Sequence, residues 1–154
     1  MYKMDELING FPLYTYPICF AFQFIIFPLM TQFNTVFVYN TIFTVFLLKD
    51  YFYEIDYILS AHHILAMVYL WSFCKTKREV STFTIAEIGS GVYNLYTLAK
   101  HYHYQVTEIH ILYFIVMTAS NLYVIDYLHR SNRSILFRIP CYIIIIGREY
   151  FIFL

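Results

Sequence analysis

Long apolar runs follow one another along this chain and constrain its fold more than any other feature. Crossing the hydrocarbon core of a bilayer takes a helix of about 20 mostly apolar residues. Candidate runs, two of them short, lie at about residues 11–30, 34–48, 57–73, 81–99, 106–128 and 134–154. They predict an all-α fold, a polytopic transmembrane helical bundle of about six helices, with five to seven as the range. Neither a repeat nor a linker divides the chain, so residues 1–154 are expected to form a single transmembrane domain.

The small charged fraction argues against most other classes of protein. Charged residues make up 13% of the chain and hydrophobic residues 60%, whereas about a quarter of a soluble domain is charged. A soluble enzyme and a disordered chain are therefore close to excluded. Ten basic and ten acidic residues cancel, so no basic surface is expected to bind nucleic acid. The scattered cysteines form no CxxC pair and should pack as small apolar side chains: Cys19, Cys74 and Cys141.

Charges between the apolar runs predict how the helices are oriented in the membrane. Two connections are basic, with Lys75, Lys77, Arg78, Arg130 and Arg133. The opposite side carries fewer basic residues and most of the acids: Lys3, Lys49, Lys100, Asp5, Glu6, Asp50, Glu54, Asp56 and Glu108. By the positive-inside rule, both basic connections face the cytoplasm and both termini face away from it.

A few polar residues lie inside the apolar runs, where ionisable groups are costly and often functional. His62 and His63 lie in the third run, and Glu87 and Asn94 lie in the fourth. A short basic connection joins the two runs, so the helices should pack antiparallel with His63 level with Gly91. Residues at positions 87, 91 and 94 share one helical face. The pattern therefore predicts a polar pocket between these two helices.

The chemistry that such a pocket favours is base catalysis, because a neutral imidazole beside a carboxylate is a common general base. The expected catalytic residues are His62, His63 and Glu87. The expected substrate-binding residues are Ser90, Gly91 and Asn94. A structural interpretation stays open, in which the same groups only hydrogen-bond to one another and fix helix packing. No metal site is expected, because the chain lacks the histidine spacings of di-iron centres and adjacent helical histidines point about 100° apart.

The other charges inside the runs have simpler interpretations. Asp126 lies one turn before Arg130, so an ion pair along the helix surface explains it. Arg138 can extend to the interface from the first turn of the last run, or meet Asp126. Arg148 and Glu149 lie near the far end of that run, which favours an interfacial position.

Two segments, IDYILSAHHILAMVYLW and FTIAEIGSGVYNLYTLAK, resemble the TLC domain. This family includes ceramide synthases, translocating-chain-associated membrane proteins and lipid-handling relatives. In it a double histidine lies within one helix, and an acidic residue follows in the next helix; here His62–His63 and Glu87 match. The similarity covers residues 57–100. The chain has Glu87 and Ser90 where ceramide synthases carry a DxxD pair, and Asn40 is the nearest polar residue to an acid often found in the preceding helix. It therefore resembles the non-synthase branch more closely.

The resemblance implies a multi-pass protein of lipid metabolism in the endoplasmic reticulum membrane, with a lipid ligand or substrate. One activity that it implies is acyl-CoA-dependent N-acylation of a sphingoid-type amine through the His-His/Glu pocket. Acyl-CoA would then be a co-substrate, and no cofactor would be bound. The alternatives are a non-catalytic lipid-binding, lipid-sensing or lipid-regulating protein, and a structural membrane subunit.

Overall fold

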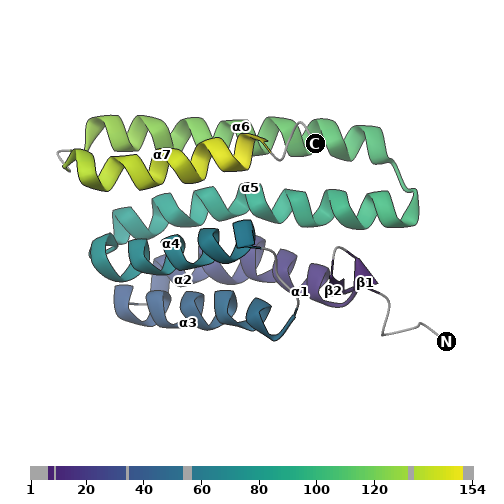
Figure 1. Ribbon diagram of the computed structural model, residues 1–154, viewed down its shortest axis with the longest axis horizontal. Helices are drawn as coiled ribbons and strands as arrows, with labels where there is room; N and C mark the ends of the chain where they lie inside the picture. Colours follow the sequence, from purple (N-terminus) through teal and green to yellow (C-terminus); the bar gives the residue numbers. More distant parts are fainter. Residues whose placement is uncertain (1–6, 9, 34, 54–56, 132–133, 151–154) are drawn as a thin grey trace. The chain divides into compact units, whose positions relative to one another are not determined.

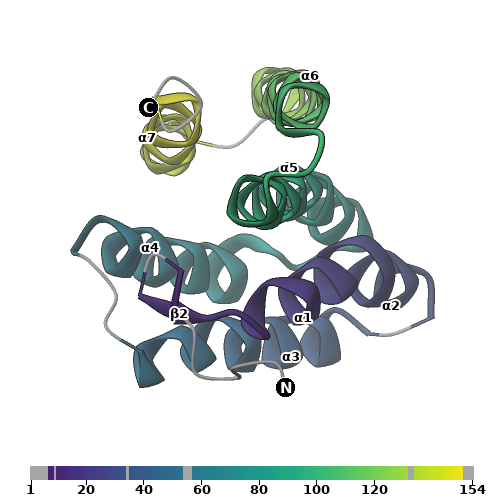
Figure 2. The same cartoon turned by 90° about the vertical axis from the view of Figure 1, so that its right-hand side faces the viewer.

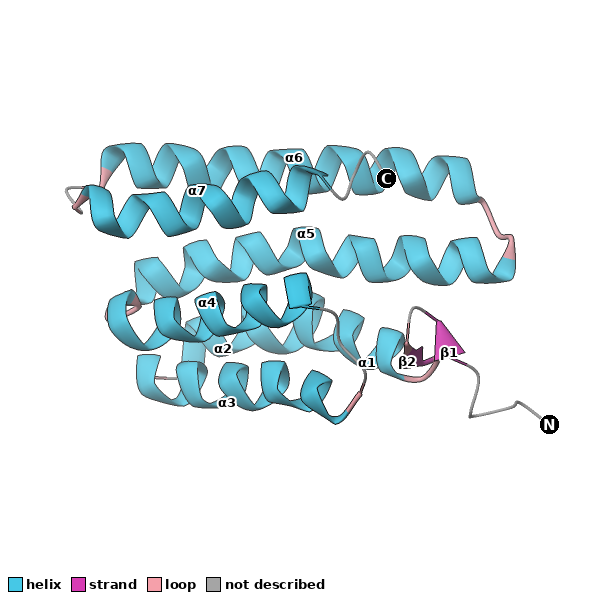
Figure 3. Cartoon of the chain, in the orientation of Figure 1, coloured by secondary structure: helices cyan, strands magenta, loops and turns pink. Residues whose placement is uncertain are grey.

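The computed structural model is all-α, and the strands among its described residues form one short hairpin (Figures 1 and 3). It describes residues 7–8, 10–33, 35–53, 57–131 and 134–150. The helices are α1 (Thr15–Ala21), the π-helix η1 (Phe22–Ile26), α2 (Phe27–Phe33), α3 (Val36–Leu48), the 3₁₀-helix η2 (Lys49–Phe52), α4 (Tyr57–Phe73), α5 (Lys77–Tyr102), α6 (Val106–Arg130) and α7 (Ile135–Tyr150). Because α1, η1 and α2 follow without a break, they form one continuous helix. The described residues therefore contain six main helices, and the all-α prediction is confirmed.

Two helices of the described part are both long enough and apolar enough to cross a membrane. They are the continuous helix over Thr15–Gln32 and α6. The apolar helix α4 has 17 residues, and α3 has 13. Length and composition thus support two spans weakly, and the other four stay predictions.

The chain forms two compact units, Met1–Ser81 and Thr82–Leu154. The first contains the hairpin, helices α1 to α4 and the first turn of α5. The second contains the rest of α5 with α6 and α7. Several charges that predict the orientation lie outside the described residues, namely Lys3, Asp5, Glu6, Glu54, Asp56 and Arg133.

The first apolar run begins with a hairpin rather than a helix. The strands β1 (Leu7–Ile8) and β2 (Phe11–Pro12) pair antiparallel. Between them Gly10 has a φ of 83°, which glycine adopts without the strain that a side chain would bring. The Thr15 hydroxyl donates to the Pro12 carbonyl at 2.7 Å, and the helix starts at Thr15. The predicted start at residue 11 is therefore too early.

A π-helical turn allows the first helix to continue through Pro28. Proline has no N–H, and its ring clashes with the preceding turn of an ordinary α-helix. Just before it, the chain widens over Phe22–Ile26, where the Phe27 N–H bonds the Phe22 carbonyl five residues back. The wider turn accommodates the proline, so the helix continues to the end of α2.

Aromatic rings pack the first helix against α3. The Phe27 ring lies 4.5 Å from that of Phe43 and 5.1 Å from that of Phe46, centroid to centroid. Both Phe27 and Phe43 are fully buried. Each such pair contributes about 0.5–1.5 kcal/mol beyond the burial of its area. Figure 2 looks along the helices and shows α3 beside α2 and α4, which it contacts.

Asn40 links α3 to the end of α4. Its side-chain amide donates to the carbonyl oxygens of Leu70 at 3.0 Å and Cys74 at 3.2 Å. Carbonyls in the last turn of a helix have few partners within it, and the Leu70 carbonyl also accepts from the Cys74 N–H at 3.2 Å. The buried Asn40 therefore caps α4 from a neighbouring helix and fixes the register of the two helices.

A capping box begins α5 at Lys77, earlier than the predicted start at residue 81. The Glu79 N–H donates to the Thr76 hydroxyl oxygen at 3.3 Å. In return the buried Glu79 carboxylate accepts from the Thr76 N–H at 2.9 Å and the Lys75 N–H at 2.9 Å. The Thr-x-x-Glu pattern is a recognised start signal, so this boundary was readable from the sequence.

Replacing Glu79 with alanine should lower the free energy of unfolding by about 1–2 kcal/mol, because the donors at the start of α5 lose their acceptor. The measured quantity is the temperature at which the fully buried Cys74 thiol reacts with maleimide when the protein is heated in detergent. The matched control is Glu108→Ala, an exposed acid in the first turn of α6. An equal loss in both variants would mean that the capping box contributes nothing beyond the acid's charge.

In the second unit, α5 turns back into α6, and α7 packs along α6 (Figure 1). His103 and Gln105 in the turn have positive φ values of 54° and 42°. Near the turn, the rings of Tyr96 and Tyr113 stack at 5.7 Å with an angle of 7° between their planes. Tyr113 is 1% exposed, so the stack joins the two helices at a buried position.

Candidate functional site

The structure places a carboxylate beside one of the two predicted histidines. His63, on α4, is buried, and its Nε2 lies 3.6 Å from the Oδ2 of Asp50. Asp50 comes from η2, the single 3₁₀ turn that ends α3 and bends the chain back toward α4. The distance is longer than a hydrogen bond, but it is close enough for the carboxylate to bias the orientation of the ring.

Lys49 binds the other oxygen of the same carboxylate. Its Nζ lies 2.5 Å from Asp50 Oδ1 and 4.1 Å from the centre of the Phe46 ring. Burial raises the pKa of the Asp50 carboxyl above its usual value, and the neighbouring Lys49 ammonium opposes this rise. The carboxylate is thus flanked by an ammonium on one oxygen and an imidazole on the other.

Tyr51 fixes η2 against the start of α4. Its hydroxyl donates to the Ser60 carbonyl at 3.1 Å, and the Ser60 hydroxyl donates back to the Tyr51 oxygen at 3.3 Å. The centre of the Tyr51 ring lies 6.1 Å from that of His63. These contacts hold the segment that carries Asp50 over the buried imidazole.

The second nitrogen of the His63 ring faces the protein interior. Within the described part of the chain, Nδ1 is buried and has no hydrogen-bond partner. The neighbouring His62 is only half-buried, and the two ring centres are 5.9 Å apart. The two histidines therefore differ in environment: the His63 ring is enclosed by protein, and the His62 ring is partly open.

The other predicted site residues lie on α5 in the second unit. Glu87 and Gly91 are buried, while Ser90 and Asn94 are half-buried. The helix continues through all four, so the shared face of positions 87, 91 and 94 follows from its geometry. Because the histidines belong to the first unit, their convergence with Glu87 stays a prediction.

The sequence did not identify Asp50 as a partner of His63, because it was assigned to a surface connection. One signal was present. Asp50 ends one apolar run, and the next begins only a few residues later. A connection this short brings its own residues close to the first turns of the following helix. Tertiary contact, rather than spacing along one helix, forms the pair.

Arg148 has a different environment from the interfacial position that the sequence favoured. Its side chain is 8% exposed, and its Nη2 donates to the Ala86 carbonyl and lies 3.1 Å from the Met117 sulfur. The close approach depends on Gly89, since a Cβ there would lie 2.7 Å from the same Nη2. The long Arg148 side chain thus extends from α7 to groups on α5 and α6.

Asp126 and Arg138 are two further charged residues whose environments the structure describes. The Arg130 Nε donates to Asp126 at 2.8 Å, and both side chains are exposed, so the predicted ion pair along α6 is confirmed. Arg138 donates to the Ser131 carbonyl at 2.5 Å.

No three of the described His, Cys, Asp and Glu side chains are grouped so that they could hold a metal ion. Among the cysteines, Cys74 and Cys141 are buried thiols and Cys19 is half-buried. Compared with known proteins, the chain matches no protein-family model, no curated protein and no solved structure.

Proposed function

We propose that the chain is a multi-pass membrane protein of the TLC type that acts on a lipid amine, with His63 as its proton acceptor. The apolar runs and the two helices of membrane-spanning length support the membrane assignment. The segments around His62–His63 and Glu87 support the TLC resemblance. By the same resemblance, the proposed location is the endoplasmic reticulum membrane.

The observation that carries the catalytic part is the arrangement around His63. One ring nitrogen faces the Asp50 carboxylate, and the other is buried without a hydrogen-bond partner among the described residues. A carboxylate beside Nε2 favours the tautomer with its proton on Nε2, which leaves the lone pair on Nδ1. Catalytic contacts are often long in unliganded enzymes and shorten when substrate binds.

The proposed reaction is N-acyl transfer from acyl-CoA. The amine nitrogen attacks the thioester carbonyl, a C–N bond forms, and the C–S bond breaks. His63 takes the proton that the amine loses and passes it to the departing thiolate, so no oxidant or reductant is needed. Asp50 takes the orienting role near the imidazole, while Glu87, Ser90, Gly91 and Asn94 remain predicted members of the pocket.

The test is amide formation by the purified chain in lipid nanodiscs, with palmitoyl-CoA and a sphingoid amine, measured by mass spectrometry. His63→Asn should lower the rate at least about a hundredfold, the usual contribution of a general base. The matched control is His103→Asn, because His103 is exposed in the α5–α6 turn and asparagine tolerates its positive φ.

Equal rates for His63→Asn and the wild type would refute the role of His63. A wild-type chain that forms no amide, but retains a bound lipid that His63→Asn loses, would instead establish the non-catalytic lipid-binding alternative. Lipids extracted from both purified proteins make this comparison in the same preparation.

A further inference from the structure

Lys49 lies beside the carboxylate that faces His63, and two contacts hold its ammonium there. The Nζ atom is 2.5 Å from Asp50 Oδ1 and 4.1 Å from the centre of the Phe46 ring. The Lys49 and Asp50 side chains are 26% and 13% exposed, so water screens their charges less than those of a surface ion pair. Both residues belong to the single turn of η2, which keeps the ammonium next to the carboxylate.

The two oxygens of the Asp50 carboxylate face different partners. Oδ1 accepts from Lys49, and Oδ2 lies 3.6 Å from His63 Nε2. An ionised carboxylate can only accept hydrogen bonds, whereas a protonated one can also donate. Ionised Asp50 therefore favours the His63 tautomer with its proton on Nε2, and protonated Asp50 favours the tautomer with its proton on Nδ1. The charge on Asp50 thus decides whether Nδ1 carries a lone pair or a proton.

Burial and Lys49 act on this charge in opposite directions. Burial raises the pKa of the Asp50 carboxyl, whereas the Lys49 ammonium lowers that pKa through its charge and its hydrogen bond. The structure places further titratable side chains near the carboxylate: His63 and His62 on α4, Tyr51 in η2 and Tyr53 directly after it. A neutral imidazole or phenol supplies no positive charge. The carboxylate therefore depends on Lys49 to stay ionised.

We propose that Lys49 is a positioning residue that keeps Asp50 ionised, holds the His63 proton on Nε2, and so leaves Nδ1 able to accept the proton of the amine. Lys49 acts through Asp50 and does not have to touch the substrate. The step at the amine rests on the proposed function, whereas the effect of Lys49 on the tautomer does not.

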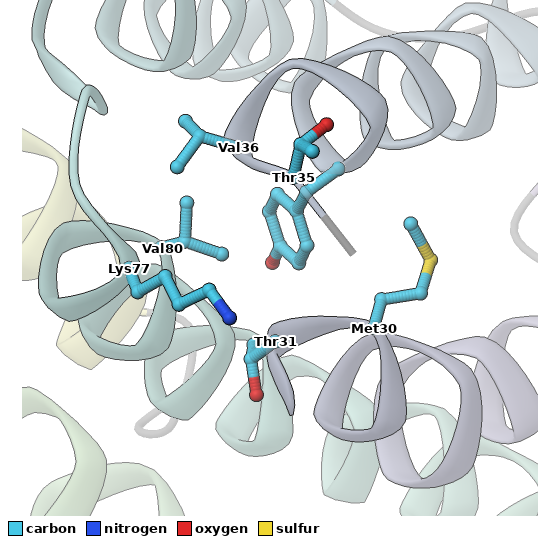
Figure 4. Close-up of a pocket in the computed structure, with 7 residues that line it drawn as sticks. Met30, Thr31, Thr35, Val36, Lys77 and Val80 are labelled. Atoms are coloured by element: carbon cyan, nitrogen blue, oxygen red, sulfur yellow. The ribbon is translucent and has the colours of Figure 1, made fainter. Parts of the chain in front are cut away.

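Lys77 provides a matched control for removal of the Lys49 charge. It belongs to the same unit and lines a small pocket at the turn between α2 and α3 (Figure 4). Its Nζ lies 3.4 Å from the Gln32 carbonyl oxygen, which carries no net charge. Lys77→Met thus removes an ammonium that faces a neutral group. Lys49→Arg is the conservative variant, because it retains the positive charge.

The experiment follows the His63 ring by nitrogen NMR of the full chain in lipid nanodiscs, with isotope-labelled histidine and without substrate. The His63 signals are those that His63→Asn removes. In the wild type at neutral pH, the proton should lie on Nε2. In Lys49→Met, the pH below which the proton moves from Nε2 to Nδ1 should rise by about one unit or more, the usual effect of losing an adjacent opposite charge. Lys49→Arg and Lys77→Met should behave like the wild type.

A wild-type tautomer in Lys49→Met at every pH would overturn the proposal, as would equal shifts in Lys49→Met and Lys77→Met. A His63 ring that gains a proton on Nδ1 and keeps the one on Nε2 would also overturn it. In that case Lys49 would act directly on the charge of the imidazole and not through Asp50.

The rate of amide formation is the second readout. Lys49→Met should lower kcat by about tenfold at neutral pH, leave KM nearly unchanged, and recover as rising pH ionises Asp50. A loss that stays the same at every pH would mean that Lys49 has only a structural role. A chain that shows the change of tautomer but forms no amide would confirm the effect of Lys49 on His63 and refute the proposed activity. Amide formation that needs His63 but not Lys49 would refute this inference alone.

Discussion

Replacing Asn40 with aspartate should destabilise the first unit by about 3–5 kcal/mol, as expected when a buried charge has no partner. The amide now donates to the carbonyl oxygens of Leu70 and Cys74. A carboxylate of the same shape would donate to neither and would face both oxygens with negative charge. Asn40 is 3% exposed, so water cannot compensate.

Maleimide labelling of Cys74 measures the effect, because this thiol is fully buried and its carbonyl is one of the two acceptors. The midpoint of thermal labelling should fall by about 10 °C. Asn40→Leu is the control of similar size: it loses the two bonds without adding a charge, which should cost about 1–3 kcal/mol. If the two variants unfolded at the same temperature, repulsion at the carbonyls would play no part.

Apolar run length was enough to locate the six main helices, because each run must be buried or face lipid and is bounded by polar residues. The ends were less accurate where local hydrogen bonds decide them. The hairpin and Thr15 delay the first helix. The box of Thr76 and Glu79 starts α5 early. Both signals are local, so the sequence contains them.

The candidate site was less predictable, because its contacts join segments that the sequence treats separately. His63 was identified from its position inside an apolar run. Its partner Asp50 was not, since a charge in a connection is indistinguishable from a surface charge until the turn of η2 is known. The inward position of Arg148 was unpredictable for the same reason, because it depends on a residue of another helix. That residue is Gly89, whose lack of a side chain leaves room for the guanidinium.

Replacing Gly89 with leucine should destabilise the second unit by about 3 kcal/mol or more, because the packed helices leave no room for a side chain. A Cβ at this position would lie 2.5 Å from the Ser120 oxygen, 2.7 Å from Arg148 Nη2 and 3.0 Å from the Met117 sulfur. Maleimide labelling of Cys141, a buried thiol on α7, should therefore begin at a lower temperature.

Gly147 provides the control for this substitution, since a Cβ there would meet nothing within 4 Å. Gly147→Ala should leave the second unit as stable or stabilise it by up to about 1 kcal/mol, through the better helix propensity of alanine. Gly89→Ala gains the same propensity but must displace the Ser120 hydroxyl and the guanidinium. If Gly89→Ala were as stable as Gly147→Ala, the approach of the Arg148 guanidinium to α5 would not depend on the glycine.

Combining Gly89→Ala with Arg148→Met should lower the free energy of unfolding by less than the sum of the two single changes, because the guanidinium is one of the groups that the new methyl displaces.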